Sequence, residues 1–371
     1  MPDFDELNAT TQKEIIPRKI TDLVFRNSPA LAYLRRDAIP FEGGAFIQSP
    51  FLYGTMNGGA YSMGDTFNLA KPTVLDAMAF DLRTYYRNVT EYLEEISIEN
   101  KGKLAVFSLI NAHIDVAFKS MNANLAIDLY RHGQGIITGI SDSRVKHING
   151  VSEALNNGTD NSWDGNVFTT YGTKSRSTFD ELNCTPYFVG NSDGSAGTIT
   201  YNVMEERYQN ACRGNVEPNL IDVGKAGYAF IKERIQPQQR FNQEKDPVWG
   251  VNSFRFNNAM VLKNDYCPSA QFGVNDPSLG NYLTSTFTSA AAPTAGSNLP
   301  AATTITVAEL MIMWNTKQWE FRLSNDPLFQ FGWTGFKVAQ NSTMVAGQTL
   351  AALNLYCRAP WGSQQIYGFN S

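Results

Sequence analysis

The chain has 371 residues, of which 43% are hydrophobic and 18% charged, the balance of a globular protein with a sizeable core. Its formal net charge is -5 at pH 7, so any contact with nucleic acid would need a local patch. No apolar run is long enough to span a bilayer, and the polar, acidic start lacks the pattern of a signal peptide. These features exclude a membrane-embedded protein and a classically secreted one.

The cysteines predict neither a metal site nor a disulfide framework. They are far apart in the sequence, form no CxxC pair and have no cluster of histidines nearby. We therefore expect reduced and mostly buried thiols. The residues concerned are Cys184, Cys212, Cys267 and Cys357, with His113, His132 and His147 as the three histidines.

Residues 1–40 carry scattered charge, the prolines Pro17, Pro29 and Pro40, and only short helical patterns, around 20–24 and 31–34. Such a segment has little core of its own, so it is either a loose tail or an arm that lies on another surface. Its apolar residues favour the arm. The candidates for contact with another subunit in this segment are Ile15, Ile16 and Phe25.

Residues 41–90 predict a long β-hairpin. A strand-like segment at 45–53 and an extended run at 75–89 flank a glycine-rich tip that contains Asn57-Gly58-Gly59. Exposed apolar loops of this kind mark contact with a partner, although a hairpin folded back on its own core stays open as an alternative. The contact candidates on the hairpin are Phe46, Phe51, Tyr53 and Tyr61.

Residues 99–132 predict one long helix, because apolar residues recur there at steps of three and four. Asp115 stands four residues before Lys119, the favourable order for an ion pair. Gly133 and Gly135 are expected to end the helix. At 1.5 Å per residue, roughly thirty residues give a rod of about 45 Å, the length of a spine. An ordinary amphipathic core helix is the alternative.

The remaining chain predicts a mixed α/β region. Residues 160–197 favour loops and short strands, and residues 274–304 favour a long surface insertion because they are low in charge and without period. Strand patterns return between 304 and 357, so the chain is expected to end in a sheet. Between these regions we expect a helix capped by Thr200, a strand at 220–223, a helix at 225–235, and strands at 254–256 and 259–262.

One motif looks catalytic: Gly190, Ser192 and Gly194 fit the G-x-S-x-G pattern of a nucleophile elbow. That motif needs a helix directly after the serine, whereas the following residues favour a flexible loop. A triad in the order serine, acid, histidine also lacks its last member, because no histidine follows His147. A serine hydrolase using Ser192 therefore stays a remote alternative.

Two further groups of residues are explained without a ligand. The glycines fit a dinucleotide loop only loosely and follow a helix where such a loop should open one. The carboxylates suit a helix start, where negative charge is favourable. These groups are Gly133, Gly135 and Gly139, and Glu94, Glu95 and Glu99. The sequence thus predicts no catalytic site, no cofactor and no metal.

Seven segments form an ordered set along almost the whole chain. They are Val89-Thr90 with Leu93-Glu94-Glu95, Asn122 to Tyr130, Glu217 to Ile221, Gln236 to Phe241, Phe254 to Asn257, Asp265 to Pro268, and Leu353 to Cys357. This set resembles the major capsid proteins of tailed bacteriophages with the Hong Kong 97 type fold, also called the Johnson fold. The resemblance implies an α+β fold.

The resemblance also implies a division of the chain. The expected parts are an N-terminal arm (1–40), an extended loop (41–90), a peripheral domain with the spine helix (91–149), an axial domain (150–265), peripheral strands (266–349) that include the insertion 274–304, and a C-terminal strand returning to the axial domain (350–371). The insertion is longer than expected of the family. Because the arm begins almost at Met1, the resemblance implies a separate scaffolding protein or none.

As to function, the resemblance implies a structural protein without catalysis. It would self-assemble as hexamers and pentamers into the icosahedral head shell of the virion, in the host cytoplasm, around double-stranded DNA that it contacts non-specifically. The other expected partners are a portal and, in some family members, scaffolding and decoration proteins, with no membrane. Only Lys71 lies near the hairpin tip, so the covalent cross-link of some members is not expected. An encapsulin-like nanocompartment shell is the alternative within the fold.

Overall fold

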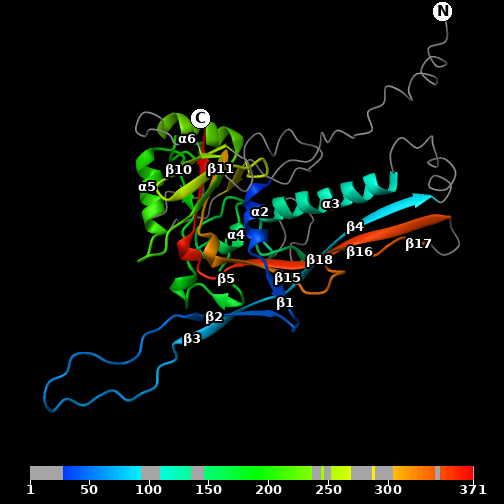
Figure 1. Cartoon of the computed structure of the whole chain (residues 1–371). Helices are drawn as coiled ribbons and strands as arrows, with labels where there is room; N and C mark the ends of the chain where they lie inside the picture. The colour runs from blue at the N-terminus through cyan, green and yellow to red at the C-terminus, as the bar shows by residue number, and fades with distance from the viewer. Residues whose placement is uncertain are drawn as a thin grey trace, which may run out of the picture. The chain divides into compact units, whose positions relative to one another are not determined.

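The computed structural model describes residues 28–92, 109–134, 146–235, 244–245, 252–268, 286–288, 304–338 and 343–370 (Figure 1). The chain divides into two units. The described residues of the first unit fall within 84–125 and 324–352, and those of the second within 28–83, 126–323 and 353–370. Several sequence predictions lie outside the described residues: Ile15, Ile16, Phe25, Glu94, Glu95, Glu99, Gly135, Gly139 and most of 274–304.

In the first unit, β18 is the strand on which the sheet is built, because β4, β16 and β17 each pair with it. β16 runs antiparallel to β18, with Gln330 opposite Ala351. A bulge between Gln330 and Gly332 shifts the register, and Phe331 at that point has a φ of 59°. The strands are β4 (Arg83–Tyr92), β16 (Gln330–Trp333), β17 (Lys337–Val338) and β18 (Met344–Cys357), of which residues 344–352 belong to this unit.

The predicted long helix is α3 (Leu109–Asp128), which is about 30 Å long at 1.5 Å per residue. Residues 99–108, the start of the prediction, lie outside the described chain. The predicted ion pair is confirmed, with 3.0 Å between Lys119 Nζ and Asp115 Oδ2. His113, on the same helix, contacts the buried carboxylate of Glu91 on β4 through its Nδ1.

The expected end of this helix at Gly133 is wrong, because α3 stops at Asp128. The next two carbonyls, of Leu129 and Tyr130, are taken by backbone N–H groups of the short helix α4 (Val151–Ala154) at 2.9 and 3.2 Å. Gly150 permits this approach, since a Cβ there would lie 2.5 Å from the Leu129 carbonyl oxygen. A distant segment therefore ends the helix, and the downstream glycines do not.

The second unit contains a seven-stranded mixed sheet in the order β7-β19-β14-β8-β11-β10-β9. β8 is parallel to β11 and β19 to β7, while the other neighbours are antiparallel. The prediction that the chain ends in a sheet is confirmed. The strands are β7 (Tyr187–Phe188), β8 (Leu220–Val223), β9 (Glu244–Lys245), β10 (Asn252–Phe256), β11 (Ala259–Lys263), β14 (Glu309–Trp314) and β19 (Gln364–Phe369).

Both faces of this sheet are covered, because every residue of β8, β14 and β19 is buried. On one face, Met204 of α5 (Tyr201–Asn210) and Phe230 of α6 (Lys225–Ile235) share a hydrophobic core with Met311. Side chains alternate along a strand, so Ile312 points to the opposite face, as does its cross-strand partner Asp222 on β8. That second face therefore carries the buried carboxyl group of Asp222.

The predicted cap of α5 is confirmed, since Thr200 Oγ1 accepts a hydrogen bond from the Val203 N–H at 3.4 Å. The helical pattern near 31–34 is also confirmed by α2 (Pro29–Arg36).

The other described elements are short strands and 3₁₀ turns. β15 (Trp319–Ser324) pairs with residues 353–357 of β18. The rest are β1 (Ile39–Phe41), the hairpin β5 (Thr170–Tyr171) and β6 (Lys174–Ser175), the pair β12 (Thr286–Thr288) and β13 (Thr304–Thr306), and the 3₁₀ turns η4 (Asp180–Leu182), η5 (Thr316–Gln318) and η6 (Pro360–Gly362).

Two predicted strands are each divided in the structure. The extended run at 75–89 becomes β3 (Leu75–Phe80) and β4, because the chain breaks at Asp81, whose carbonyl accepts a hydrogen bond from Asn354 Nδ2 at 2.6 Å. The strand expected from 304 becomes β13 and β14, with Ala308 between them at a φ of 47°. Only the first half of the 75–89 run therefore belongs to the hairpin.

Candidate functional site

The β2–β3 hairpin carries the sequence-predicted contact residues that the structure describes. β2 (Ile47–Leu52) and β3 pair antiparallel, from Ile47 opposite Phe80 to Leu52 opposite Leu75. This confirms the predicted hairpin. The strands are joined by a long connection, residues 53–74, which we call the tip loop (Figure 1).

An aromatic contact and an ion pair fix the outer end of the paired strands. Phe179 lies edge-on to Phe51 and to Tyr53, with ring centroids 5.3 and 4.9 Å apart. Lys174 on β6 donates to Asp76 on β3, with Nζ 2.6 Å from Oδ1. The hydrogen bond from Lys174, followed by that from the Ala77 N–H, lowers the pKa of the Asp76 carboxyl. The hairpin is thus held by its own chain just before the tip loop begins.

The inner end of β3 is packed more tightly. Phe80 lies against Tyr171 on one side and stacks on Tyr356 on the other, with centroid distances of 5.2 and 4.8 Å. The Ala79 N–H donates to the Gly172 carbonyl at 3.0 Å. Gly172 has a φ of 54°, and a Cβ there would lie 2.7 Å from a Met78 side-chain carbon. Only glycine fits this position without strain or displacement.

Within the tip loop, a few hydrogen bonds connect the two arms. The Tyr53 N–H donates to the Val74 carbonyl at 3.1 Å, and Asn57 Nδ2 donates to the Ala70 carbonyl at 2.7 Å. At the far end, the Ser62 N–H donates to the Asp65 carboxylate at 2.6 Å. These contacts shape the loop, but they bury almost none of it.

Every residue from 55 to 71 is exposed. Several of them are large apolar side chains that a soluble surface does not normally display together. Their exposed fractions reach 92% for Leu69 and 103% for Met63. The exposed apolar residues of the tip loop are Met56, Tyr61, Met63, Phe67 and Leu69, and Leu52 and Leu75 flank it.

The predicted contact residues divide into two groups. Phe46 and Tyr61 are exposed, at 45% and 71%, and Tyr61 lies edge-on to Phe67 of the same loop, with ring centroids 5.3 Å apart. Phe51 and Tyr53 are half-buried because they rest on Phe179. The sequence predicted Phe46, Phe51, Tyr53 and Tyr61 and did not single out Phe67, the methionines or the leucines. The signal was present, since Met56, Met63 and Leu69 stand among glycine, asparagine and serine, where no core is expected.

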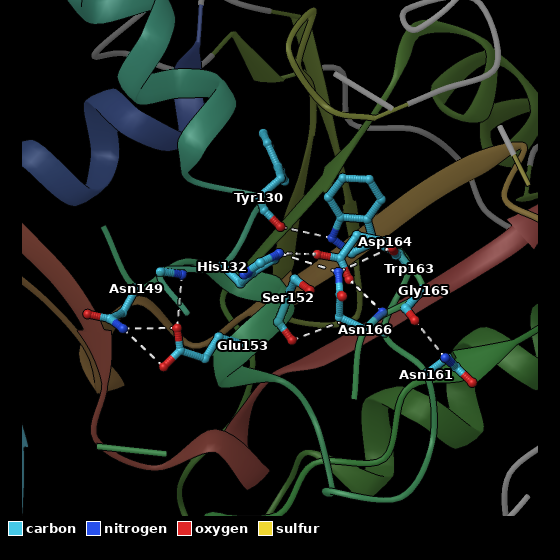
Figure 2. A network of polar contacts seen from close by, with 12 residues as sticks. Tyr130, His132, Asn149, Ser152, Glu153, Asn161, Trp163, Asp164, Gly165 and Asn166 are labelled. Atoms are coloured by element: carbon cyan, nitrogen blue, oxygen red, sulfur yellow. Dashed lines mark hydrogen bonds and ion pairs between the residues drawn. The ribbon is translucent and has the colours of Figure 1, made fainter. Parts of the chain in front are cut away.

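A second group of polar side chains forms the buried network around α4 (Figure 2). Trp163 Nε1 donates to the Tyr130 carbonyl at 2.9 Å, and Asn161 Nδ2 donates to the Gly165 carbonyl at 2.7 Å. His132 Nε2 lies 3.7 Å from Asp164 Oδ2. Two of these contacts join the loop around 156–168 to the residues after α3, and the third lies within the loop. Because the residues are largely buried, the network holds this loop in place.

Glu153 is the centre of the other half of Figure 2. It is fully buried, and its carboxylate accepts hydrogen bonds from the Gly133 N–H at 3.0 Å, from Gln134 Nε2 at 2.5 Å, and from Asn149 Nδ2 at 2.9 and 3.0 Å. A buried carboxylate is stable when several N–H groups satisfy it. These bonds fasten the residues after α3 to α4.

Ser192 does not lie on a nucleophile elbow. β7 precedes it, but the chain then forms a turn in which Ser195 Oγ donates to Asp193 at 2.6 Å and Asn191 Nδ2 donates to Ser195 Oγ at 2.9 Å. The next helix, α5, begins only at Tyr201. Since the motif requires a helix directly after the serine, the hydrolase reading has no geometric support here.

Other candidate sites are also explained structurally. The four cysteines are free, and burial raises the pKa of the Cys184 thiol to about 12. Within the described residues, no group of three or more His, Cys, Asp and Glu side chains is arranged to hold a metal ion. No helix among them has the length and apolar character that crossing a membrane requires.

Comparison with known proteins identifies the fold of this chain. No protein-family model matches the chain, and a search of curated proteins finds no match. Solved structures do match. The capsid asymmetric unit of cyanophage A-1(L) is 14% identical, with 96% of each chain covered and a TM-score of 0.60. The chain has the Hong Kong 97 type capsid fold. The predicted fold class and the resemblance are thereby confirmed.

Two further structures extend the Hong Kong 97 type comparison beyond that phage. The capsid of a native GTA particle is 9% identical, with 98% of this chain and 99% of that chain covered and a TM-score of 0.54. The holo-SrpI encapsulin complex from Synechococcus elongatus PCC 7942 is 10% identical, with 100% and 96% covered and a TM-score of 0.53. At such identities the likeness establishes the fold, and the function has to be argued from this chain's own residues.

Proposed function

We propose that this chain is a shell-forming structural protein, the major capsid protein of a tailed bacteriophage. Many copies would self-assemble as hexamers and pentamers into the icosahedral head shell of the virion. The observation that carries the proposal is the tip loop, in which every residue from 55 to 71 is exposed although several are large and apolar. The Hong Kong 97 type fold supports it.

The physical reason is that an isolated chain leaves the apolar tip loop in water. Burying a large apolar side chain is favourable by about 1.5–3 kcal/mol, so a second copy that covers Met63 and Leu69 gains stability with each contact. A closed shell also needs elements that reach beyond their own subunit. The fixed base at Phe179 and Lys174 keeps the loop available for such a contact.

Charge has little part in this contact. Asp65 and Lys71 are the only charged residues in the tip loop, so its net charge is zero. Neighbouring copies therefore neither repel nor attract each other through this loop at long range. The association that we propose is apolar.

In this proposal the chain has no catalytic role, and its segments have the parts expected from the resemblance. Residues 1–40 act as the arm, 41–90 as the extended loop, 91–149 as the peripheral domain and 150–265 as the axial domain. Residues 266–349 supply peripheral strands with the insertion 274–304, and 350–371 the strand that returns to the axial domain. The shell encloses double-stranded DNA that it contacts non-specifically, and a portal and scaffolding or decoration proteins complete the particle. Assembly takes place in the host cytoplasm.

The alternative within the fold is a nanocompartment shell, which the likeness to an encapsulin supports. The two functions differ in their contents. Particles purified from cells that express the chain with its neighbouring genes should contain nuclease-protected DNA if it is a phage capsid. Co-purification of one cargo protein without DNA would instead support the nanocompartment.

The first experiment is negative-stain electron microscopy of the chain expressed alone and with its neighbouring genes. Uniform hollow shells or capsomer rings are expected. A monodisperse monomer or dimer in every condition would overturn the proposal.

The role of the tip loop is tested by deleting residues 54–64, which should leave a folded chain that no longer forms shells. The matched control replaces the small exposed residues Thr55, Ala60 and Thr66 with serine, which leaves the apolar side chains in place. Circular dichroism and the unfolding midpoint would report whether each variant folds. Normal particles from a folded deletion variant would remove residues 54–64 from the assembly contact while leaving the shell function intact.

A further inference from the structure

The chain contains three Asn-Gly steps, at Asn57, Asn149 and Asn157. Asparagine followed by glycine is the step most prone to deamidation, because glycine has no Cβ to hinder attack by its backbone nitrogen on the asparagine side chain. We propose that Asn57, in the tip loop, is a site of spontaneous deamidation in the unassembled chain, and that Asn149 and Asn157 are protected by the fold. The link to assembly rests on the function proposed above.

Asn57 has the open surroundings that the reaction requires. Asn57, Gly58 and Gly59 are all exposed, and nothing lies within 4 Å of a Cβ placed on either glycine. Among the described residues, none accepts a hydrogen bond from the Gly58 N–H. Within the described part of the chain, the Asn57 side chain makes one hydrogen bond, from Nδ2 to the Ala70 carbonyl at 2.7 Å. This bond is exposed and must open for the reaction.

Asn149 is locked on both sides. It is 5% exposed, its Nδ2 donates to both oxygens of Glu153, and its Oδ1 accepts from Asn354 Nδ2 at 2.8 Å. Gly150 is wedged against backbone carbonyls, since a Cβ there would overlap the carbonyl oxygen of Arg131. Neither water nor a rearranged backbone can reach this amide in the folded chain.

Asn157 is protected in a different way, because the attacking nitrogen, that of Gly158, is itself engaged in a hydrogen bond. The Gly158 N–H donates to Asn156 Oδ1 at 2.8 Å. Asn157 Oδ1 accepts from the Thr159 and Asp160 N–H groups at 3.0 and 2.8 Å, and its Nδ2 donates to Asp160 Oδ2 at 2.7 Å. The fold therefore leaves one of the three Asn-Gly pairs, Asn57-Gly58, accessible to deamidation and protects the other two.

The reaction balances with water as the only co-reactant. The Gly58 nitrogen, after losing its proton to water or hydroxide, attacks Cγ of Asn57, so a new C–N bond forms and the bond from Cγ to Nδ2 breaks. Nδ2 leaves as ammonia after taking a proton from water, and a cyclic succinimide remains. Water then opens one of the two ring C–N bonds, which gives aspartate or, when the backbone bond opens, isoaspartate.

The product changes the tip loop in two ways. A carboxylate cannot donate to the Ala70 carbonyl, so this bond between the two arms is lost. The loop, which has only Asp65 and Lys71 as charged residues, also acquires a net negative charge. Burying that charge in an apolar contact with a second copy is unfavourable, so deamidated chains should be excluded from shells, and chains already in shells should be protected.

The test is peptide mapping by mass spectrometry during incubation of the unassembled full chain at mildly alkaline pH. Asn57 should show the amide-to-acid mass change several-fold faster than Asn149 and Asn157. Incubation in denaturant is the reference, because all three steps should then react at similar rates. The variant Gly58→Ala, which fits the open space and adds a Cβ, should slow the reaction at Asn57 alone.

Equal rates at the three sites in the folded chain, or a slower rate at Asn57, would overturn the proposal whatever the function of the chain. The link to assembly has its own readout. Asn57→Asp should reduce shell yield while Asn57→Ser, which removes the amide without adding charge, should not. Rapid deamidation of Asn57 inside intact shells would show that the tip loop is not covered by a neighbour, and it would leave the chemistry at Asn57 standing.

Discussion

Asp222 is a buried acid without a cationic partner among the described residues. It is fully buried on β8, where Tyr130 donates a hydrogen bond to Oδ2 and Asn264 Nδ2 donates to the same oxygen at 3.3 Å. Burial raises the pKa of the Asp222 carboxyl to about 7, against the opposing effect of these hydrogen bonds. Glu309, also buried, has its pKa raised to about 7 for the same reason.

The sign of the resulting pH dependence follows from the two states. Between about pH 4 and pH 7 the unfolded chain has already lost the Asp222 proton while the folded chain keeps it. The folded state therefore binds more protons, and its stability falls as pH rises through this window, by up to about 4 kcal/mol for this one group. The contribution is fully present only below the unfolded pKa.

We expect Asp222→Asn to flatten this dependence, because an amide of the same shape does not ionise. The measurement is the free energy of unfolding of the unassembled chain at pH 5 and pH 8, from denaturant titration. Glu309→Gln should likewise reduce the fall in stability between pH 5 and pH 8, because the pKa of Glu309 is also raised to about 7. Comparing the two variants separates the contribution of each carboxyl group. A variant that loses as much stability as the parent between these pH values would contradict the assignment.

Glu153 gives a second prediction for a single residue. Replacing its carboxylate with the amide of Glu153→Gln puts a donor where Gly133, Gln134 and Asn149 already donate. A buried polar group left unsatisfied costs about 1–3 kcal/mol, so the unfolding midpoint should fall accordingly. The matched control is Glu42→Gln at an exposed position, which should leave the midpoint unchanged. Equal midpoints for both variants would show that the cradle around Glu153 does not stabilise the fold.

At the scale of single elements, the attachment of the hairpin depends on Gly172. Gly172→Ala forces a Cβ to within 3 Å of Met78 and Phe80 and places a non-glycine residue at a positive φ. We expect the free energy of unfolding to fall by about 1–3 kcal/mol, measured as a lower unfolding midpoint. Proteolysis of the tip loop should also become faster. Gly59→Ala, where a Cβ meets nothing within 4 Å, is the control. Unchanged protease sensitivity in Gly172→Ala would contradict this role.

Elements whose bounds depend on residues close together in the sequence were predictable, whereas those whose bounds depend on residues far apart in the sequence were not. The cap at Thr200, the pair Asp115–Lys119 and the hairpin strands follow from residues a few positions apart. The end of α3 does not, because the N–H groups that stop it come from Val151 and Ser152. The sequence placed β19 only within the expected C-terminal strand 350–371 and did not give its bounds, because β19 is short and buried on both faces and so lacks the alternation that marks a half-exposed strand.

The candidate site was partly predictable in the same sense. Glycine and asparagine around Asn57 indicated a loop, and the aromatic residues indicated contact, which correctly selected Phe46 and Tyr61 as exposed residues. That Phe51 rests on Phe179 could not be foreseen, because the two are far apart in the sequence. Whether these residues meet a neighbouring subunit stays a prediction.

At the scale of the whole molecule, the nearly uncharged tip loop determines how assembly should respond to salt. Sulfate strengthens apolar burial because it is excluded from protein surfaces, whereas sodium chloride mainly screens charges. Shell yield should therefore rise with sodium sulfate and change little with sodium chloride of the same ionic strength. Light scattering during assembly would measure both. Shells that dissolve with increasing sodium chloride would point to ion pairs as the dominant contact.

The composition of the tip loop has a further consequence for the proposed shell, in which rings of five and six copies would meet. Such a shell requires the same segment to meet its neighbour at more than one angle. Met56 and Met63 have unbranched side chains that adopt many shapes and pack against irregular surfaces. An apolar loop with adaptable methionine side chains on a base fixed by Phe179 and Lys174 could thus serve non-equivalent positions with a single sequence, so the loop sequence need not determine the curvature of the shell.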